Sequence, residues 1–392
     1  MSEWNTYKIS DIYAGLYDGP HATPPDSDEG AVFLGISNIT ANGHIDLTSV
    51  KHISVYDLPK WTKRVTPQEG DIVFSYEATL NLYGIIPKGF WGCLGRRMAL
   101  IRPDEDKCHG KFLYYYFFSP QWRSTIAENT ILGATVDRIP IAKFPDFPVT
   151  IPSLSTQKRI AGILSAYDDL IENNQRQIKL LEEAAQRLYK EWFVDLRFPG
   201  HENVQIVDGV PEGWKRQKLV DIAKVQYGYA FDGSLFNSER NGTPIIRIRN
   251  IPDGITADYT TEEADEQYIV HNGDIVVGMD GEFHINSWCG HDSYLVQRTC
   301  CIKPYNTDMK GWLLNAIYEP IKFFEKTVVG ATVAHLGKKH IDTIYLLTAQ
   351  DELYKPFTNL FNLRQNLLNQ NQWLTEARDR LLPKLMSGEI EV

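Results

Sequence analysis

The sequence predicts a mixed α/β protein in which two similar α/β domains are separated by an antiparallel coiled coil of two long helices. Three observations lead to this fold class. Short motifs recur in the same order in both halves, each half ends in a long heptad-patterned stretch, and the remaining residues carry strand and turn signals. With 43% hydrophobic and 23% charged residues, the 392-residue chain has enough apolar material for packed cores.

The internal repeat is the strongest of these signals. Motifs of the first half return in the second with an offset that drifts from 210 residues at Trp4/Trp214 to 193 at Arg187/Arg380. Chance matches would not stay collinear, so we interpret the chain as a pseudo-two-fold repeat. The other repeated blocks are Ile36–Ile39 with Ile248–Ile251, Gly70–Val73 with Gly273–Val276, Arg97–Pro103 with Arg298–Pro304, and Gly133–Val136 with Gly330–Val333.

Residues 1–150 and 201–348 are expected to form the two domains. The first segment is rich in Gly, Pro, β-branched and aromatic residues. Within it, Gly70–Phe74 and Ala99–Ile101 are predicted strands between turn signals, and Lys111–Ser124 is predicted to be one aromatic-rich helix. The repeat assigns a similar compact α/β domain to the second segment.

Residues 151–200 and 349–392 are predicted long helices. Their seam positions alternate in steps of four and three, and in the second stretch this spacing includes Arg364 and Arg378. At about 1.5 Å per residue each helix is roughly 50 Å long, so we expect the two to bury their apolar stripes against each other. The predicted seam consists of Ile160, Leu164, Ile171, Asn174, Ile178, Leu181, Leu188, Leu360, Leu367, Asn371, Leu374 and Leu381.

The direction and register of the helix pair can also be predicted. Because a whole domain intervenes between the two helices, an antiparallel arrangement is favoured. A register that sets Ile160 against Leu385 places Asn174 opposite Asn371, and a buried polar pair would specify that register. In the alternative, both asparagines point to solvent and Leu368 or Leu363 fills the seam.

Several classes of chemistry find no support in the sequence. The five cysteines form no C-x-x-C pair, which argues against a disulfide framework or zinc site and favours a reducing cytoplasm. We find no phosphate loop, dinucleotide fingerprint or amino-methyltransferase tetrapeptide, and no apolar run that could span a membrane. His284, Asn286 and His291 are more typical of a loop than of a metal site. We therefore predict no catalytic residues and no metal.

The charge balance restricts how the chain could meet nucleic acid. With 40 basic and 50 acidic residues the net charge is −10, which is unusual for a freestanding DNA binder. DNA contacts would need local patches of Arg, Lys, His, Asn or hydroxyl groups. The candidates are Lys60, Lys63, Arg64, Tyr76, Asn81, Tyr83, Arg96, Arg97, Thr135 and Arg138 in the first half, and Arg247, Arg249, Asn250, His284, Asn286, Arg298, Thr332, His335, Lys338 and Lys339 in the second.

Two segments resemble a known family. The segments LYKEWFVDLRFPG at 188–200 and RDRLLPKLMSGEI at 378–390 are similar to the central and C-terminal conserved regions of type I restriction-modification specificity subunits. The resemblance implies two target recognition domains held by an antiparallel coiled coil. It also implies that each domain reads one half of a bipartite DNA site, while the coil sets the spacer and docks methyltransferase subunits.

The resemblance further implies which partners and cofactors to expect. The partners would be double-stranded DNA, two methyltransferase subunits and two restriction/translocase subunits, in the cytoplasm of a prokaryote and without a membrane. S-adenosylmethionine, ATP and Mg²⁺ are expected in these partners, with no cofactor bound by this chain. It would be the non-catalytic recognition subunit of an ATP-dependent restriction endonuclease and adenine-N6 methyltransferase. Alternatives are a nuclease, a coiled-coil assembly adaptor, and a subunit of a methylation-only system.

Overall fold

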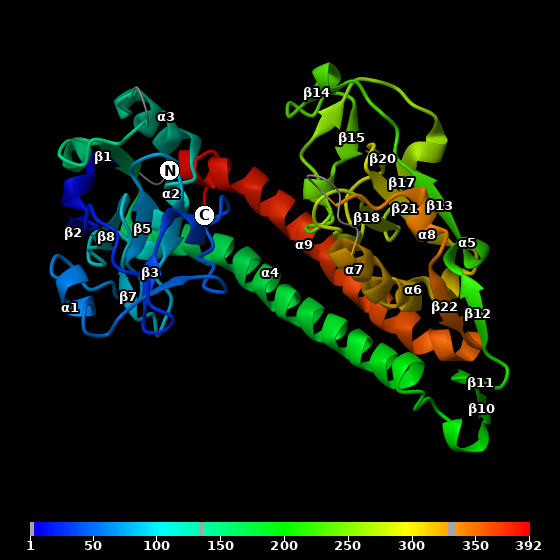
Figure 1. The fold of residues 1–392 in the computed structure, drawn as a ribbon. Helices are drawn as coiled ribbons and strands as arrows, with labels where there is room; N and C mark the ends of the chain where they lie inside the picture. Colours follow the sequence, from blue (N-terminus) through cyan, green and yellow to red (C-terminus); the bar gives the residue numbers. More distant parts are fainter. Residues whose placement is uncertain (1–3, 134–135, 328–333) are drawn as a thin grey trace. The chain divides into compact units, whose positions relative to one another are not determined.

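The structure is a computed structural model that describes residues 4–133, 136–327 and 334–392. The chain divides into two compact units, unit 1 with Met1–Asp169 and Thr375–Val392, and unit 2 with Leu170–Leu374. Each unit contains one segment of each long helix, α4 (Leu154–Tyr189) and α9 (Lys355–Ser387) (Figure 1). The predicted mixed α/β class is confirmed.

Unit 1 is built on two small sheets. The larger has the antiparallel strand order β2 (Tyr13–Asp18), β8 (Met98–Pro103), β5 (Ile72–Ser75), β6 (Tyr83–Ile85). The smaller has the order β4 (Lys51–Ile53), β3 (Ala31–Leu34), β7 (Gly92–Leu94), with β3 and β7 parallel. The other elements are β1 (Asn5–Lys8) paired with β9 (Pro148–Ile151), and the helices α1 (Leu58–Trp61), α2 (Gly110–Tyr116) and α3 (Pro120–Asn129).

Unit 2 has the same plan with additional strands. Its central sheet has the order β13 (Ala223–Tyr227), β21 (Thr299–Pro304), β18 (Ile275–Gly278), β19 (Ile285–Ser287). The second sheet has the order β14 (Phe236–Asn237), β16 (Tyr259–Thr260), β15 (Thr243–Ile246), β20 (Ser293–Leu295), β17 (Ile269–Val270). The other elements are β10 (Ile206–Val207) paired with β11 (Val210–Pro211), β12 (Lys215–Lys218) paired with β22 (Tyr345–Thr348), and the helices α5 (Leu219–Ile222), α6 (Lys310–Ala316), α7 (Tyr318–Thr327) and α8 (Lys338–Ile341).

The two units confirm the predicted internal repeat. The order β2-β8-β5-β6 in unit 1 matches β13-β21-β18-β19 in unit 2. The parallel pair β3 and β7 likewise matches the parallel pair β15 and β20. The motif positions that recur in the sequence therefore occupy equivalent places in two copies of one fold.

One predicted helix is divided in two. Residues Lys111–Ser124 were expected to form a single helix, but α2 ends at Tyr116 and α3 begins at Pro120. Ser119 explains the break, because its Oγ accepts a hydrogen bond from the backbone N–H of Trp122 at 3.2 Å and so caps α3. Proline at the first helical position adds to this start signal.

The repeated Gly-Asp-Ile-Val motif forms a buried ion pair in each unit. Asp71 is 2% exposed and accepts hydrogen bonds from Nε and Nη2 of Arg102, both at 2.8 Å. At the equivalent place in unit 2, Nζ of Lys303 lies 2.7 Å from a carboxylate oxygen of Asp274. The motif thus joins the start of β5 to β8 in unit 1 and the start of β18 to β21 in unit 2, and its role is structural.

Both long helices complete the core of each unit. In unit 1, Ile160 and Leu164 near the start of α4 share a core with Leu382 and Leu385 near the end of α9. In unit 2, Phe193, just after the end of α4, lies 5.8 Å from Phe357 near the start of α9, measured between ring centroids. The helices therefore run in opposite directions in both units. No helix in the described part of the chain is long and apolar enough to cross a membrane.

An ion pair joins α9 to α4 in each unit. In unit 1, Nη1 of Arg378 donates to a carboxylate oxygen of Asp168 at 2.6 Å. In unit 2, Nε of Arg364 donates to Oε1 of Glu182 at 2.7 Å. Asp168 precedes Glu182 by fourteen residues, and Arg364 precedes Arg378 by fourteen residues, so both pairs have the same antiparallel register.

The predicted asparagine register can be compared with unit 2. Asn174 is 6% exposed and its Nδ2 donates to Oε1 of Gln370 at 3.4 Å, while Nδ2 of Asn371 donates to the carbonyl of Ile171 at 3.4 Å. The two asparagines thus lie in the contact between α4 and α9, but they bond to Gln370 and Ile171 and not to each other. Leu363, the alternative seam residue, is 55% exposed. Of the predicted seam residues, Ile160, Leu164, Asn174 and Ile178 are buried, and Ile171, Leu181, Leu188, Leu360, Leu367, Asn371, Leu374 and Leu381 are half-buried.

All five cysteines are free and buried. Burial raises the pKa of Cys93 to about 11 and that of Cys300 to about 12. A thiol is nucleophilic only as the thiolate, so these side chains are unreactive at neutral pH in the folded chain.

The buried pair in unit 1 leads to a stability prediction. Replacing Arg102 by methionine should lower the free energy of unfolding by about 2–3 kcal/mol, because the buried Asp71 carboxylate loses its ionic partner. Arg102→Lys is the matched control, since unit 2 uses Lys303 at this position, and it should retain most of the stability. Chemical denaturation measures both. Equal losses in the two variants would contradict the structural role of the pair.

Candidate nucleic-acid interface

Several candidate DNA-binding residues lie directly after the equivalent strands β5 and β18. At this point three segments of the chain meet in each unit, and we call the meeting point the junction. It consists of residues 76–78, 97 and 137–139 in unit 1, and of residues 279–281, 298 and 334–336 in unit 2.

In unit 1, the junction is held together by the backbone and by one ion pair. The backbone N–H of Tyr76 donates to the carbonyl of Arg97 at 3.1 Å, and that of Ile139 donates to the carbonyl of Tyr76 at 2.8 Å. Nε of Arg97 lies 3.2 Å from Oε2 of Glu77. The arginine is therefore placed by its backbone and by a carboxylate on the adjacent segment.

Unit 2 repeats this geometry with other side chains. The backbone N–H of Met279 donates to the carbonyl of Arg298 at 2.9 Å, and that of Leu336 donates to the carbonyl of Met279 at 2.7 Å. Nη1 of Arg298 lies 2.8 Å from a carboxylate oxygen of Asp280. Nδ1 of His335 lies 2.5 Å from the other oxygen of the same carboxylate.

Both arginines adopt the left-handed backbone conformation. The φ angle is 72° at Arg97 and 66° at Arg298. This region is uncommon for residues other than glycine, because Cβ crowds the backbone. The pattern extends to the equivalent positions Ala78, with φ of 68°, and Gly281, with φ of 71°.

More candidates surround the junction of unit 1. The hydroxyl of Tyr76 lies 3.4 Å from Nδ1 of His21. Asp18 lies 3.1 Å from Nε2 of His21 and forms an ion pair with Arg64. Burial raises the pKa of Tyr76, the negative charges of Asp18 and Glu77 raise it further, and the charges of Arg64 and Arg97 oppose the shift. The structure thus brings Arg64, Tyr76 and Arg97 together.

In unit 2, basic residues of α8 follow the junction along the chain. Nζ of Lys338 pairs with a carboxylate oxygen of Asp342 at 2.8 Å, and Lys339 is exposed. Partial burial lowers the pKa of His340, and the charges of Lys339 and His335 lower it further. His335, Lys338 and Lys339 therefore lie in one basic region with Arg298 close to it.

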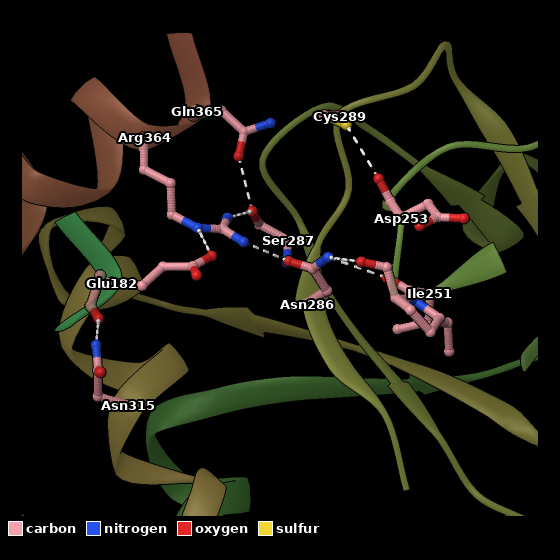
Figure 2. Close-up of polar contacts among 11 residues, drawn as sticks. Glu182, Ile251, Asp253, Asn286, Ser287, Cys289, Asn315, Arg364 and Gln365 are labelled. Carbon is pink, nitrogen blue, oxygen red and sulfur yellow. Dashed lines mark hydrogen bonds and ion pairs between the residues drawn. The ribbon is translucent and has the colours of Figure 1, made fainter. Parts of the chain in front are cut away.

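Asn286, a candidate for base contacts, instead faces the interior of unit 2. Its Nδ2 donates to the carbonyls of Ile251 at 3.0 Å and Pro252 at 2.8 Å, and its Oδ1 accepts from Nη2 of Arg364 at 2.7 Å (Figure 2). Arg364 also donates to Oγ of Ser287 at 2.6 Å. Asn286 thus joins β19 to α9 through Oδ1 and to the segment at Ile251 through Nδ2.

Tyr83 is another candidate that the structure places in a core. It is 1% exposed, and its hydroxyl accepts a hydrogen bond from Nε1 of Trp122 at 2.9 Å and donates to Oδ1 of Asn81 at 3.2 Å. A base contact by Tyr83 would require it to leave the core. Asn81, half-buried with φ of 62°, orients this hydroxyl.

The side chains of Arg247, Arg249 and Asn250 in unit 2 contact nearby groups of the same domain. Oδ1 of Asn250 accepts from the backbone N–H of Arg247 at 2.8 Å, as Asn38 does for Gly35 in unit 1. The guanidinium of Arg249 pairs with Asp258, while that of Arg247 lies over the ring of Phe236. Asn250 therefore has a structural role that both units share.

The remaining candidates are half-buried, exposed or outside the described residues. His284 lies 3.6 Å from Glu282, and no group of three or more His, Cys, Asp or Glu side chains in the described ranges is arranged to hold a metal. Lys60, Lys63, Arg96 and Arg138 are exposed, and Thr135 and Thr332 lie outside the described residues.

A known family matches both halves of the chain. The family described as "Type I restriction modification DNA specificity domain" matches residues 1–183 and 211–370. The chain belongs to this family. The predicted resemblance is therefore confirmed, and the protein is a specificity subunit, the non-catalytic member of such a system.

Similar proteins support this assignment over the whole length. The type I restriction enzyme MjaIX specificity subunit of Methanocaldococcus jannaschii is 26% identical, over 98% of this chain and 89% of the relative. The HindI specificity subunit of Haemophilus influenzae is 22% identical over all of both chains. The crystal structure of the type I restriction-modification S subunit from M. genitalium shares the fold, with a TM-score of 0.54 and 18% identity over 98% of this chain and 96% of that one.

Sequence reasoning missed the acidic residues of the specificity subunit's two junctions. Glu77 and Asp280 each lie seven residues after the glycine of a repeated Gly-Asp-Ile-Val motif, so aligning the two halves on this motif would have shown an acidic residue at the same position in both. Arg364 was recognised as a heptad position but not as a buried contact. A charged residue at a seam position signals a buried partner, because an unpaired charge there is costly.

The polar cluster around Arg364 leads to a second stability prediction. Arg364→Ala should lower the free energy of unfolding by about 2–3 kcal/mol, because Glu182, Asn286 and Ser287 lose a shared donor. Arg176→Ala is the matched control, since Arg176 forms an exposed helical pair with Glu172 and should change stability by less than about 0.5 kcal/mol. Thermal denaturation and hydrogen exchange in β19 measure the effect. Unchanged exchange in β19 would contradict the assignment.

Proposed function

We propose that each unit of this specificity subunit reads one half of a bipartite DNA site. The observation that carries the proposal is the repeated junction, in which one backbone arrangement presents different side chains in two copies of one fold. Unit 1 has Glu77 and Arg138 where unit 2 has Asp280 and His335. A shared scaffold with different polar side chains suits two domains that read different sequences, because the fold positions the side chains and their contacts with the bases determine which sequence is recognised.

The two long helices would set the distance between the half-sites. Helix α4 has 36 residues, and a straight helix of that length spans roughly 50 Å. This corresponds to about fifteen base pairs at about 3.4 Å each, less the length that the two recognition domains cover. The unread spacer of the DNA site would follow from this separation.

The same helices would dock two methyltransferase subunits. In unit 2, they expose large apolar side chains, with Leu180 64% exposed on α4 and Trp373 64% exposed on α9. Leu170 and Leu363 are also more than half exposed. Exposed apolar residues on packed helices are typical of protein interfaces, and tryptophan is enriched among the residues that contribute most to binding.

The rest of the complex would supply catalysis and positive charge. Two restriction/translocase subunits would complete the assembly, and S-adenosylmethionine, ATP and Mg²⁺ would bind to the partner subunits. The net charge of −10 supports a basic contribution from the partners, because DNA binding depends on neutralising phosphates.

Mapping of N6-methyladenine across the host genome tests the reading function. We expect methylation at one bipartite motif that disappears when this chain is deleted. Replacing residues 201–348 by the matching segment of a relative should change one half of the motif and leave the other half unchanged. An assembly adaptor would leave the motif unchanged after this replacement. Methylation without restriction of foreign DNA would identify a methylation-only system.

Trp373 tests the docking face. Trp373→Ala should weaken binding to the methyltransferase subunit by about thirtyfold, because an exposed tryptophan at an interface contributes roughly 2 kcal/mol. Trp91, 51% exposed in unit 1 and outside the helices, supplies the control Trp91→Ala, which should bind normally. Titration of the two subunits measures the affinity. Equal affinities of both variants would place docking elsewhere.

A further inference from the structure

Arg97 and Arg298 share a strained conformation that the fold does not require of arginine. Both sit directly before equivalent strands, β8 and β21, with φ of 72° and 66°. Glycine adopts this conformation without steric cost, and Gly281 does so next to Asp280. An arginine kept in the left-handed region in both copies of a repeat indicates a use for its side chain, since strained residues concentrate at functional sites.

Each of these arginines has a carboxylate beside it, and Arg298 is the more exposed of the two. The Arg298 side chain is 68% exposed while its partner Asp280 is 17% exposed, and in unit 1 the Arg97 and Glu77 side chains are 32% and 29% exposed. A guanidinium has five N–H donors, and one ion pair leaves most of them available. The carboxylate contacts Nη1 in Arg298 and Nε in Arg97, and so restrains each side chain while its other nitrogens lie outside this ion pair.

Resting on the proposed function, we propose that Arg97 and Arg298 are the equivalent base-contacting residues of the two recognition domains, and that Glu77 and Asp280 are positioning residues that hold them. A planar guanidinium suits the O6 and N7 acceptors of guanine in the major groove, and restraint of its rotamers lowers the entropic cost of that contact. Each arginine would then help to specify its own half-site and have no effect on the other.

The second basic residue at each junction distinguishes the two domains. In unit 2, His335 contacts Asp280 with its side chain, at 2.5 Å from Nδ1 to the carboxylate. In unit 1, Arg138 pairs with Glu77 through the backbone and its side chain is exposed. The carboxylate of Asp280 therefore contacts two side chains, Arg298 and His335, whereas Glu77 has Arg97 as its ion-pair partner. His335 therefore helps to fix the Asp280 carboxylate, a contact that Glu77 does not have among the described residues of unit 1.

Selection from a DNA library tests the base contacts with the complete complex. The probe is a double-stranded library with a randomised central segment, bound by the specificity subunit together with its methyltransferase subunits. Arg298→Lys should reduce the preference at one base pair of one half-site by about tenfold, because lysine keeps the charge but lacks the planar fork. Arg97→Lys should do the same in the other half-site, and the salt dependence of binding should stay unchanged in both.

The outcomes separate this inference from the proposed function. A wild-type complex that enriches no bipartite sequence overturns the proposed function itself. A bipartite wild-type motif that both variants retain overturns the inference alone. Loss of preference in both half-sites at once also overturns it, because the arginines would then act on binding in general.

Glycine variants control for folding. Arg97→Gly and Arg298→Gly relieve the left-handed strain, so their melting temperatures should equal or exceed that of the wild-type chain while the half-site preference is lost. A drop in melting temperature together with lost preference would identify the arginines as structural and overturn the proposal.

The positioning role of the carboxylates has its own test. Asp280→Asn should relax the preference in the same half-site as Arg298→Lys without lowering the melting temperature. Asp280→Glu should retain the preference, since Glu77 fills this place in unit 1. If the Asp280→Asn complex selected the same sequences as the wild type, Asp280 would have no positioning role. If the variant had a lower melting temperature and lost preference equally in both half-sites, its role would be structural.

Discussion

The structure of each unit depends on one constraint, which is that neither long helix can bury its apolar face alone. In unit 1, the sheet domain packs on the start of α4 and the end of α9, and in unit 2 on the end of α4 and the start of α9. The ion pairs of Arg378 with Asp168 and of Arg364 with Glu182 give both segments the same register. A slip of one residue would leave both guanidinium groups without their carboxylates, at a cost of several kcal/mol each.

The repeat separates what the fold requires from what recognition can vary. Buried polar contacts recur with similar chemistry, as in the pairs of Asp71 with Arg102 and of Asp274 with Lys303. Exposed positions at the same places differ freely in type, as Arg138 and His335 do. The exposed residues of a duplicated scaffold can therefore change, and with them the DNA bases that it contacts, while its buried contacts keep the fold the same.

Periodicity and repetition in the sequence were enough to predict the fold class, the internal repeat and the long helices, because these depend on patterns spread over many residues. The orientation of single side chains does not follow from such patterns. Asn286 and Tyr83 belong to residue types that can contact DNA, yet the structure turns one toward Arg364 and the other toward Trp122. Residue type states which bonds a side chain can form, whereas tertiary packing decides where they are formed.

The cluster around Arg364 also limits which chimaeras of this chain can fold. Arg364 is 8% exposed, and its guanidinium relies on acceptors that β19 supplies, Oδ1 of Asn286 and Oγ of Ser287. A foreign recognition domain grafted between α4 and α9 has to offer acceptors at these two positions, or else arrive with its own version of α9. Compatibility between donor and host is thus decided at the contact between a strand of the graft and α9 of the host, independently of the DNA sequence that the new domain prefers.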